Sequence, residues 1–182
     1  MAIPNLSALS VLVADDSQQM RRLLVAMLNA TGIWNVTTAS DGREALESIR
    51  LRRPDILITD ADMGHIGGME LVRSVRRNQD SAAPYLPIIM VTGHCEQSWV
   101  EQARDVGVNE FIAKPISATA LFMRISEVIL NPRPFIRAPA YVGPDRRRRR
   151  SDQFEGPFRR QSDIMEMTNS DENAPARQDK AS

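Results

Sequence analysis

The chain has 182 residues, 42% hydrophobic and 25% charged, a composition typical of one soluble globular unit with room for a tail. Its one cysteine, Cys95, excludes an intrachain disulfide, and no apolar run reaches the ~18–20 residues that cross a membrane. The formal net charge is zero and residues 1–10 lack the pattern of a secretory signal, so we expect a cytoplasmic protein.

Short apolar runs alternate with amphipathic segments through residues 10–130. In chain order they predict a strand at 10–14, a helix between the cap Ser17 and Gly32, a strand at 33–39, a helix at 43–53, a strand at 55–59, a helix after Gly67-Gly68, a strand at 87–91, a helix at 96–106, a strand at 108–113 and a helix capped by Ser117. This alternation is typical of a parallel sheet covered on both faces. The predicted fold is α/β, with a five-stranded, doubly wound parallel sheet of the flavodoxin-like kind.

Polar side chains stand at the carboxyl ends of four of the predicted strands. Asp15 and Asp16 follow the first strand, Asp60 the third, Thr92 the fourth and Lys114 the fifth. The carboxyl ends of parallel strands share one edge of the sheet, and doubly wound proteins bind their ligands at that edge. We therefore expect these five residues to form a single site.

The chemistry of this set suits a phosphoryl group. Carboxylates repel one another, by ~4 kcal/mol for two charges ~4 Å apart at an effective dielectric of about 20, and Mg²⁺ with its oxygen ligands removes that cost. Lys114 is one of two lysines in a chain with 21 arginines, and it supplies a compact positive charge. We expect Asp60 to form an aspartyl phosphate while Asp15 and Asp16 hold the metal.

Four motifs occur in order: Asp15-Asp16, Asp60-Ala-Asp-Met63 leading to Gly67-Gly68, Val91-Thr92-Gly93, and Phe111-Ile-Ala-Lys114-Pro115. Over about residues 8–130 this set resembles the response-regulator receiver domain of two-component systems, and most closely the stand-alone chemotaxis-type receivers. The resemblance implies a phosphoprotein without a DNA-binding output domain. It would take phosphate from a histidine kinase or phosphotransfer protein and signal by binding a downstream protein target. It would not be an enzyme beyond its own phosphotransfer and dephosphorylation.

The resemblance also assigns the metal site. Asp60 is the implied phosphoacceptor, with Thr92 and Lys114 on the phosphoryl oxygens. The implied Mg²⁺ ligands are the side chains of Asp15, Asp16 and Asp60 and the backbone carbonyl of Asp62.

The remaining implied roles concern signalling and the lifetime of the phosphoryl group. Phe111 occupies the position of an aromatic switch, which turns inward when Thr92 moves toward the phosphate. Asp62 and His94 stand at two positions that flank the phosphoryl group in this family and tune its hydrolysis. The sequence therefore leaves the lifetime of the phosphorylated state open.

Periodic apolar segments stop after Asn131, and only six of the 52 residues that follow 130 are Leu, Ile, Val or Phe. That is too little apolar surface to offset the entropy of ordering a separate core. We expect a phosphoacceptor receiver domain at residues 8–130 and a Pro/Arg-rich, mostly disordered tail at residues 131–182.

The predicted tail is patterned in charge and in sequence. Residues 131–160 carry nine basic and three acidic side chains, including a run from Arg146 to Arg150 that is either solvated or binds polyanions weakly and without specificity. A weak repeat relates Tyr141-Val-Gly143-Pro144-Asp-Arg146-Arg147 to Phe154-Glu-Gly156-Pro157-Phe-Arg159-Arg160. The repeat is either a biased linker or a duplicated docking motif with an aromatic anchor.

Two further functions compete with a receiver that signals through its own surface. In one, the arginine-rich tail is the output and binds a protein or a polyanion, which deletion of residues 135–182 would test. In the other, Asp60-Ala-Asp62 matches the Asp-x-Asp nucleophile motif of haloacid-dehalogenase-type phosphatases. Those enzymes have a further acid pair after the lysine, whereas here the pair Asp15-Asp16 precedes Asp60.

Overall fold

The computed structural model describes residues 6–77, 83–94, 96–138, 141–146 and 166–167. Its elements are η1 (Leu6–Ala8), β1 (Ser10–Ala14), α1 (Gln18–Ala30), β2 (Asn35–Ala39), α2 (Gly42–Arg52), β3 (Ile56–Asp60), α3 (Gly68–Arg77), β4 (Ile88–Thr92), α4 (Gln97–Asp105), β5 (Glu110–Ala113), α5 (Ala118–Leu130), β6 (Phe135–Ala138), β7 (Tyr141–Pro144) and β8 (Glu166–Met167). No helix in these ranges is long and apolar enough to cross a membrane.

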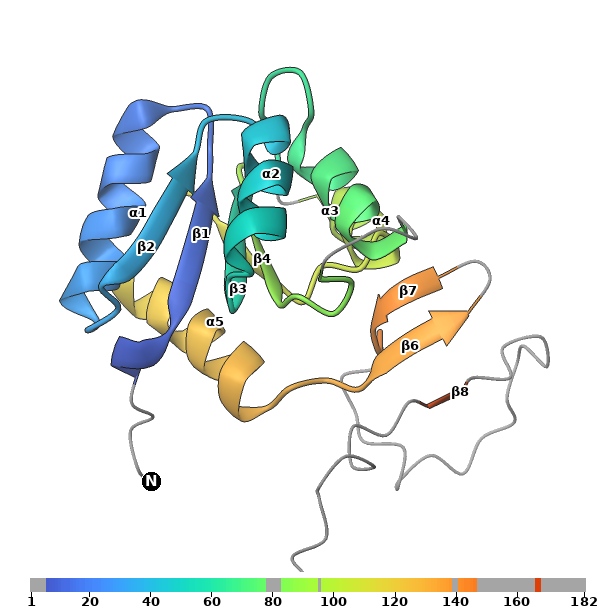
Figure 1. Ribbon diagram of the computed structural model, residues 1–182. Coiled ribbons are helices and arrows are strands. Elements are labelled where there is room, and N and C mark those ends of the chain that lie inside the picture. The colour runs from blue at the N-terminus through green and yellow to red at the C-terminus, as the bar shows by residue number, and fades with distance from the viewer. Residues whose placement is uncertain (1–5, 78–82, 95, 139–140, 147–165, 168–182) are drawn as a thin grey trace, which may run out of the picture.

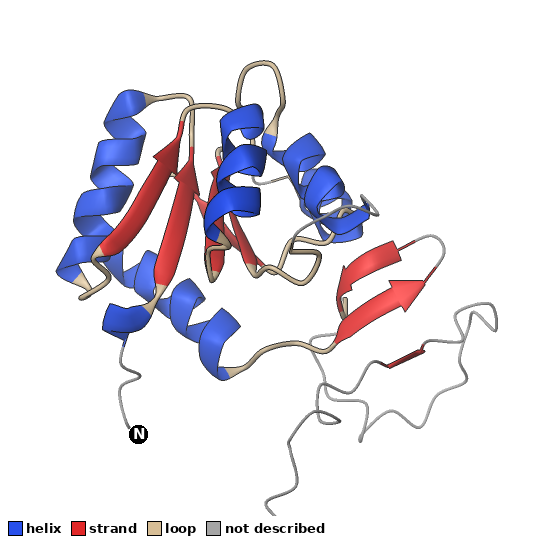
Figure 2. Cartoon of the chain, in the orientation of Figure 1, coloured by secondary structure: helices blue, strands red, loops and turns tan. Residues whose placement is uncertain are grey.

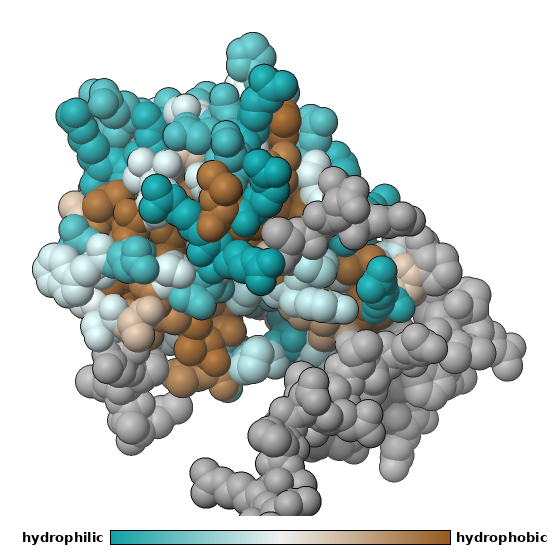
Figure 3. All heavy atoms as spheres, viewed as in Figure 1, coloured by the Kyte–Doolittle hydropathy of each residue, from teal (hydrophilic) through white to brown (hydrophobic). Residues whose placement is uncertain are grey.

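The first five strands form one parallel sheet in the order β2-β1-β3-β4-β5. The strand order reverses between β1 and β3, which is the flavodoxin-like arrangement. The predicted fold class is therefore confirmed. All carboxyl ends of these strands lie at one edge, at the top of Figure 1. That edge is mostly hydrophilic on the face shown in Figure 3.

Helices cover both faces of this sheet, which explains why its central strands are apolar at nearly every position (Figure 2). Leu12 and Met90 pack with residues of α2, α3 and α4, whereas their neighbours Val13 and Val91 pack with residues of α1 and α5. Each central strand thus supplies side chains to two separate cores.

Local signals set the ends of the helices. The Ser17 hydroxyl accepts a hydrogen bond from the Met20 N–H at 3.3 Å, and the Ser117 hydroxyl accepts one from the Ala120 N–H at 3.1 Å. Both predicted N-caps are confirmed. The second strand begins at Asn35 and not at Ile33. Ile33 follows the turn after α1, where its side chain is buried, so its apolar character does not mark a strand position.

The structure differs from the expectation for residues 131–182 in the first part of that segment. Strands β6 and β7 form an antiparallel hairpin, and β8 pairs with the other edge of β6. The Phe135 ring lies 5.3 Å from the ring of Tyr85, edge to face, and 5.0 Å below the guanidinium of Arg76. The few apolar residues of this segment do not build a core of their own, because they pack on the receiver.

Arg76, near the end of α3, anchors this contact. Its guanidinium is buried and donates hydrogen bonds to the carbonyl oxygens of Gly107 (3.0 Å) and Pro84 (2.8 Å) and to Asn109 Oδ1 (3.0 Å). Burial lowers its pKa to about 9, so the group keeps its charge near neutral pH. The hairpin lies at the lower right in Figure 1, away from the edge that carries the carboxyl ends of the strands. Residues 147–165 and 168–182, with most of the arginine run and the second copy of the repeat, lie outside the described residues.

Candidate functional site

The structure places the predicted site residues at one edge of the sheet. Asp15 and Asp16 follow β1, Asp60 ends β3, Thr92 ends β4 and Lys114 follows β5. In the strand register, Asp60 stands opposite Val91 and Thr92 opposite Ala113, so neighbouring strands end at nearly the same level. Residues that are 54 positions apart in sequence therefore come into direct contact.

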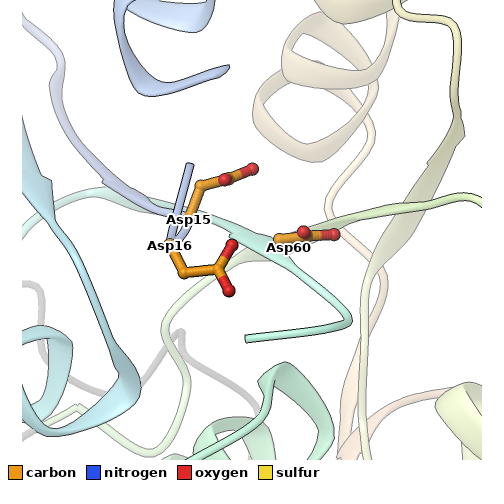
Figure 4. A group of neighbouring side chains, drawn as sticks. All are labelled: Asp15, Asp16 and Asp60. Atoms are coloured by element: carbon orange, nitrogen blue, oxygen red, sulfur yellow. The ribbon is translucent and has the colours of Figure 1, made fainter. Parts of the chain in front are cut away.

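The three carboxylates form a compact cluster. Asp15, Asp16 and Asp60 each offer an oxygen, and these oxygens lie within 4.8 Å of one another (Figure 4). Asp15 and Asp60 are buried, whereas Asp16 is exposed to solvent. Asp15 Oδ1 accepts a hydrogen bond from the Ser17 N–H at 2.8 Å, but its buried Oδ2 has no hydrogen-bond partner in the described part of the chain. A buried anionic oxygen without a donor fits a hard cation, and Mg²⁺ takes ligands of this type.

The electrostatics of Asp15 agree with such a site. Burial raises the pKa of its carboxyl, the hydrogen bond from Ser17 opposes this, and the nearby charge of Asp60 raises the pKa further. In the metal-free protein the ionised form of Asp15 is therefore destabilised by folding. The protonated carboxyl of Asp15 favours the folded state. This stabilisation is fully present below the usual pKa of 3.8 and is lost as the pH rises through the higher pKa of the folded protein.

Asp15→Asn should consequently stabilise the metal-free protein at neutral pH. The amide oxygen still accepts the Ser17 N–H, while the buried charge and its repulsion with Asp60 disappear. In EDTA we expect the melting temperature to rise by a few degrees at pH 7 and the gain to vanish near pH 3. A thermal scan at both pH values measures this, and an equal shift at both would contradict the electrostatic explanation.

Asp60 is held at both of its carboxylate oxygens. Lys114 Nζ lies 2.9 Å from Oδ2, and the Ala61 N–H donates to Oδ1 at 2.8 Å. The Lys114 side chain is 31% exposed, so its ammonium can be reached from solvent, while the Asp60 side chain is 5% exposed. This carboxylate is thus positioned beside a positive charge and at the margin of the acidic cluster.

A glycine fixes the backbone at the same place. Gly68, the first residue of α3, lies so close to β3 that a Cβ atom would collide with the Asp60 carbonyl oxygen, and its N–H donates to the Ala61 carbonyl at 3.0 Å. The predicted turn at Gly67-Gly68 therefore has a physical reason, which is the close approach of α3 to the end of β3.

Asp62 and His94 form a contact that the sequence analysis did not predict. His94 Nε2 lies 2.9 Å from Asp62 Oδ2, and the imidazole stacks on the Trp99 ring at 5.5 Å. The His94 N–H also donates to the buried Thr92 hydroxyl oxygen at 2.9 Å. Their positions in the sequence were the available signal, because Asp62 stands two residues after the end of β3 and His94 two residues after the end of the neighbouring strand β4.

Phe111 lies in β5 opposite Met90 and is half-buried against the core that covers the α2, α3 and α4 side of the sheet. Trp99 packs against the same core. The structure therefore shows where this ring rests, and its role as a switch stays a prediction.

Chemically, the arrangement offers an oxygen nucleophile, a positive charge on the same side and oxygen ligands for a cation. Such a set can accept a phosphoryl group, because Lys114 and a metal neutralise charge on the transferred oxygens. The Thr92 hydroxyl supplies a further hydrogen-bonding group at the end of the adjacent strand.

Comparison with known proteins gives a consistent result. The family model of the response regulator receiver domain matches residues 11–126. The chemotaxis protein CheY of Pseudomonas aeruginosa is 32% identical over 120 residues, which cover 66% of this chain and 95% of that protein. Among solved structures, the chemotaxis protein CheY4 of Vibrio cholerae matches with a TM-score of 0.61 and 32% identity over 66% of this chain and 99% of its own. A putative response regulator from Chloroflexus aurantiacus matches with a TM-score of 0.62 and 29% identity over 68% and 98% of the two chains.

Proposed function

Because this chain belongs to the response regulator receiver domain family, we propose that it accepts a phosphoryl group on Asp60 and signals by binding another protein in its phosphorylated form. One observation carries the assignment of the residue. Asp60 is the carboxylate that lies 2.9 Å from the Lys114 ammonium while it also belongs to the acidic cluster. The donor in this proposal is a histidine kinase or a phosphotransfer protein, and the location is the cytoplasm.

In the proposed reaction, one carboxylate oxygen of Asp60 attacks the phosphorus of a phosphohistidine. An O–P bond forms, the P–N bond breaks, and the leaving imidazole nitrogen takes a proton from solvent. Lys114 and Thr92 bind the transferred oxygens, and no other substrate is turned over. Later hydrolysis returns Asp60 and inorganic phosphate, and Asp62 and His94 stand beside the group where they can influence its rate.

A magnesium ion completes the proposal. The residues that would hold it are Asp15, Asp16 and Asp60, with the backbone carbonyl of Asp62. When bound, the ion neutralises the carboxylates and the charge on the phosphoryl oxygens.

Asp16→Asn tests the metal assignment. Mg²⁺ binds the folded protein and should raise its melting temperature by mass action. The variant should lose most of this Mg²⁺-dependent shift, because one charged ligand is gone. Asp41→Asn is a matched control at the N-cap of α2 and should keep the full shift. A Mg²⁺-dependent shift that is unchanged in Asp16→Asn would remove Asp16 from the ligand set.

The donor can be identified by measuring phosphotransfer from each purified histidine kinase of the host to this protein. A cognate kinase should phosphorylate it within the shortest incubation times, and the Asp60→Asn variant should take no label from the same kinase.

The alternative, in which the tail is the output, is favoured by the contact between Arg146 and Asp105 at 2.9 Å, since it places the start of the arginine run on the receiver. The hairpin changes which deletion is informative. Removing residues 135–182 would also remove the docked hairpin, whereas removing residues 147–182 leaves it intact. Loss of partner binding after the shorter deletion, with phosphorylation retained, supports the tail as output. Retention of binding supports the receiver surface.

A further inference from the structure

The first copy of the tail repeat is docked on the receiver. It contacts a surface that we define by Asp105 and Gly107, the repeat-binding surface. Arg146 Nη1 lies 2.9 Å from Asp105 Oδ1, and the Arg146 guanidinium stacks 4.0 Å above the ring of Tyr141. The Tyr141 ring is buried, and its hydroxyl donates to the Pro144 carbonyl at 2.6 Å.

Glycine is required where the two chain segments meet. A Cβ on Gly143 would lie 2.8 Å from the Gly107 Cα and 2.6 Å from the Tyr141 hydroxyl oxygen. On the receiver side, Gly107 has φ +98°, and a Cβ there would lie 2.8 Å from the Val142 carbonyl oxygen. The docked segment therefore needs an aromatic ring, a glycine two residues later and an arginine five residues later.

The second copy carries these features at the same spacing. Phe154, Gly156, Pro157 and Arg159 repeat the aromatic residue, the glycine, the proline and the stacked arginine. The copies differ at three positions, where Phe154, Glu155 and Phe158 stand for Tyr141, Val142 and Asp145. At Val142 it is the backbone carbonyl that approaches Gly107. The repeat therefore retains the aromatic ring, the glycine, the proline and the arginine, and it lacks the tyrosine hydroxyl.

We propose that residues 154–160 are a second ligand for the repeat-binding surface and can replace residues 141–147 within the same chain. The surface thus recognises a peptide of the form aromatic-x-Gly-Pro-x-Arg. In the observed hairpin, two residues connect β6 to Tyr141, whereas fifteen would connect β6 to Phe154. The longer loop disfavours the second copy, because the entropic cost of closing a loop rises with its length. Phe154 also lacks the hydroxyl that binds the Pro144 carbonyl in the first copy. The first copy therefore dominates, as observed.

If the two copies compete for one surface, the effects of substitutions at Gly143 and Gly156 on the melting temperature should not be additive. In the full-length protein, Gly143→Val weakens the first copy through the clash with Gly107. Gly156→Val alone should leave the melting temperature unchanged, because the second copy is then the minor occupant. In the Gly143→Val background, Gly156→Val should lower the melting temperature further, since both ligands are lost. The amide NMR signals of Asp105 and Gly107 should shift more in the double variant than in Gly143→Val.

If Gly156→Val has no effect in either background, the proposal is wrong. Should Gly143→Val fail to fold, Arg146→Ala and Arg159→Ala provide the same cycle with a milder change, because they remove only the stacked arginine. A peptide of residues 151–163 should restore the Gly107 signal of the double variant, and the same peptide with Gly156→Val should not. A rescue of Gly143→Val that increases with protein concentration would show that the second copy comes from another chain, and would overturn exchange within one chain.

Discussion

Asp60→Asn should abolish covalent phosphorylation. Incubated with acetyl phosphate and Mg²⁺, the wild-type protein is expected to gain one phosphoryl group and the variant none, because the amide is not a nucleophile toward phosphorus. The Asn side chain also loses the charge that faces Lys114 Nζ at 2.9 Å. Intact-protein mass spectrometry measures the gain directly.

Asp62→Asn is the matched control for that experiment. Asp62 is also a carboxylate in the loop after β3, but its side chain is 66% exposed and pairs with His94. This variant should still be phosphorylated, with a changed rate of hydrolysis. A phosphoryl or beryllium-fluoride adduct that formed equally well on the Asp60→Asn variant would place the acceptor elsewhere.

Among substitutions that add one methyl group near the site, Gly68→Ala should lower the free energy of unfolding most. The added Cβ would meet the Asp60 carbonyl, which is backbone and cannot rotate away, so α3 or β3 must shift. We expect a loss of roughly 1–3 kcal/mol in the free energy of unfolding, as for other overpacked positions, together with slower phosphorylation. Urea denaturation measures the first effect and the acetyl phosphate assay the second.

Gly64→Ala provides the comparison, because a Cβ at Gly64 meets nothing within 4 Å. Its free energy of unfolding should change by about 0.5 kcal/mol or less. Equal losses for the two variants would show that the close approach of Gly68 to β3 does not constrain the site.

The sequence predicted the sheet and the site edge because each depends on local patterns. Strands that are buried on both faces must be apolar along their length, so the polar residue that ends each run is visible without a structure. This is how Asp60, Thr92 and Lys114 could be assigned to one edge before their contacts were known. The role of Phe111 could not be inferred in this way, because an aromatic residue on a strand packs in the core whether or not it moves.

The pairing of Asp62 with His94 and the burial of Arg76 were not visible in the sequence, for a different reason. An arginine in the last turn of a helix normally extends into solvent and favours the helix dipole. Arg76 is buried because Gly107 and Asn109, more than thirty positions away, supply two of its three acceptors and a later strand covers it. The hairpin was missed for a related reason, since the apolar content of the tail was compared with the needs of an independent core.

The contact between the Phe135 ring and the Arg76 guanidinium has a consequence for how the protein unfolds. The family model ends at residue 126, but a chain that ended there would expose the guanidinium and the apolar surface around Tyr85 to water. Denaturant slopes scale with the surface exposed on unfolding. The m-value of the whole chain should therefore exceed that of a fragment ending at residue 134, which keeps all of α5, by more than a loose extension would add. We therefore expect the cooperative unit to extend through the hairpin, and hydrogen exchange at β6 and β7 should report global rather than local opening.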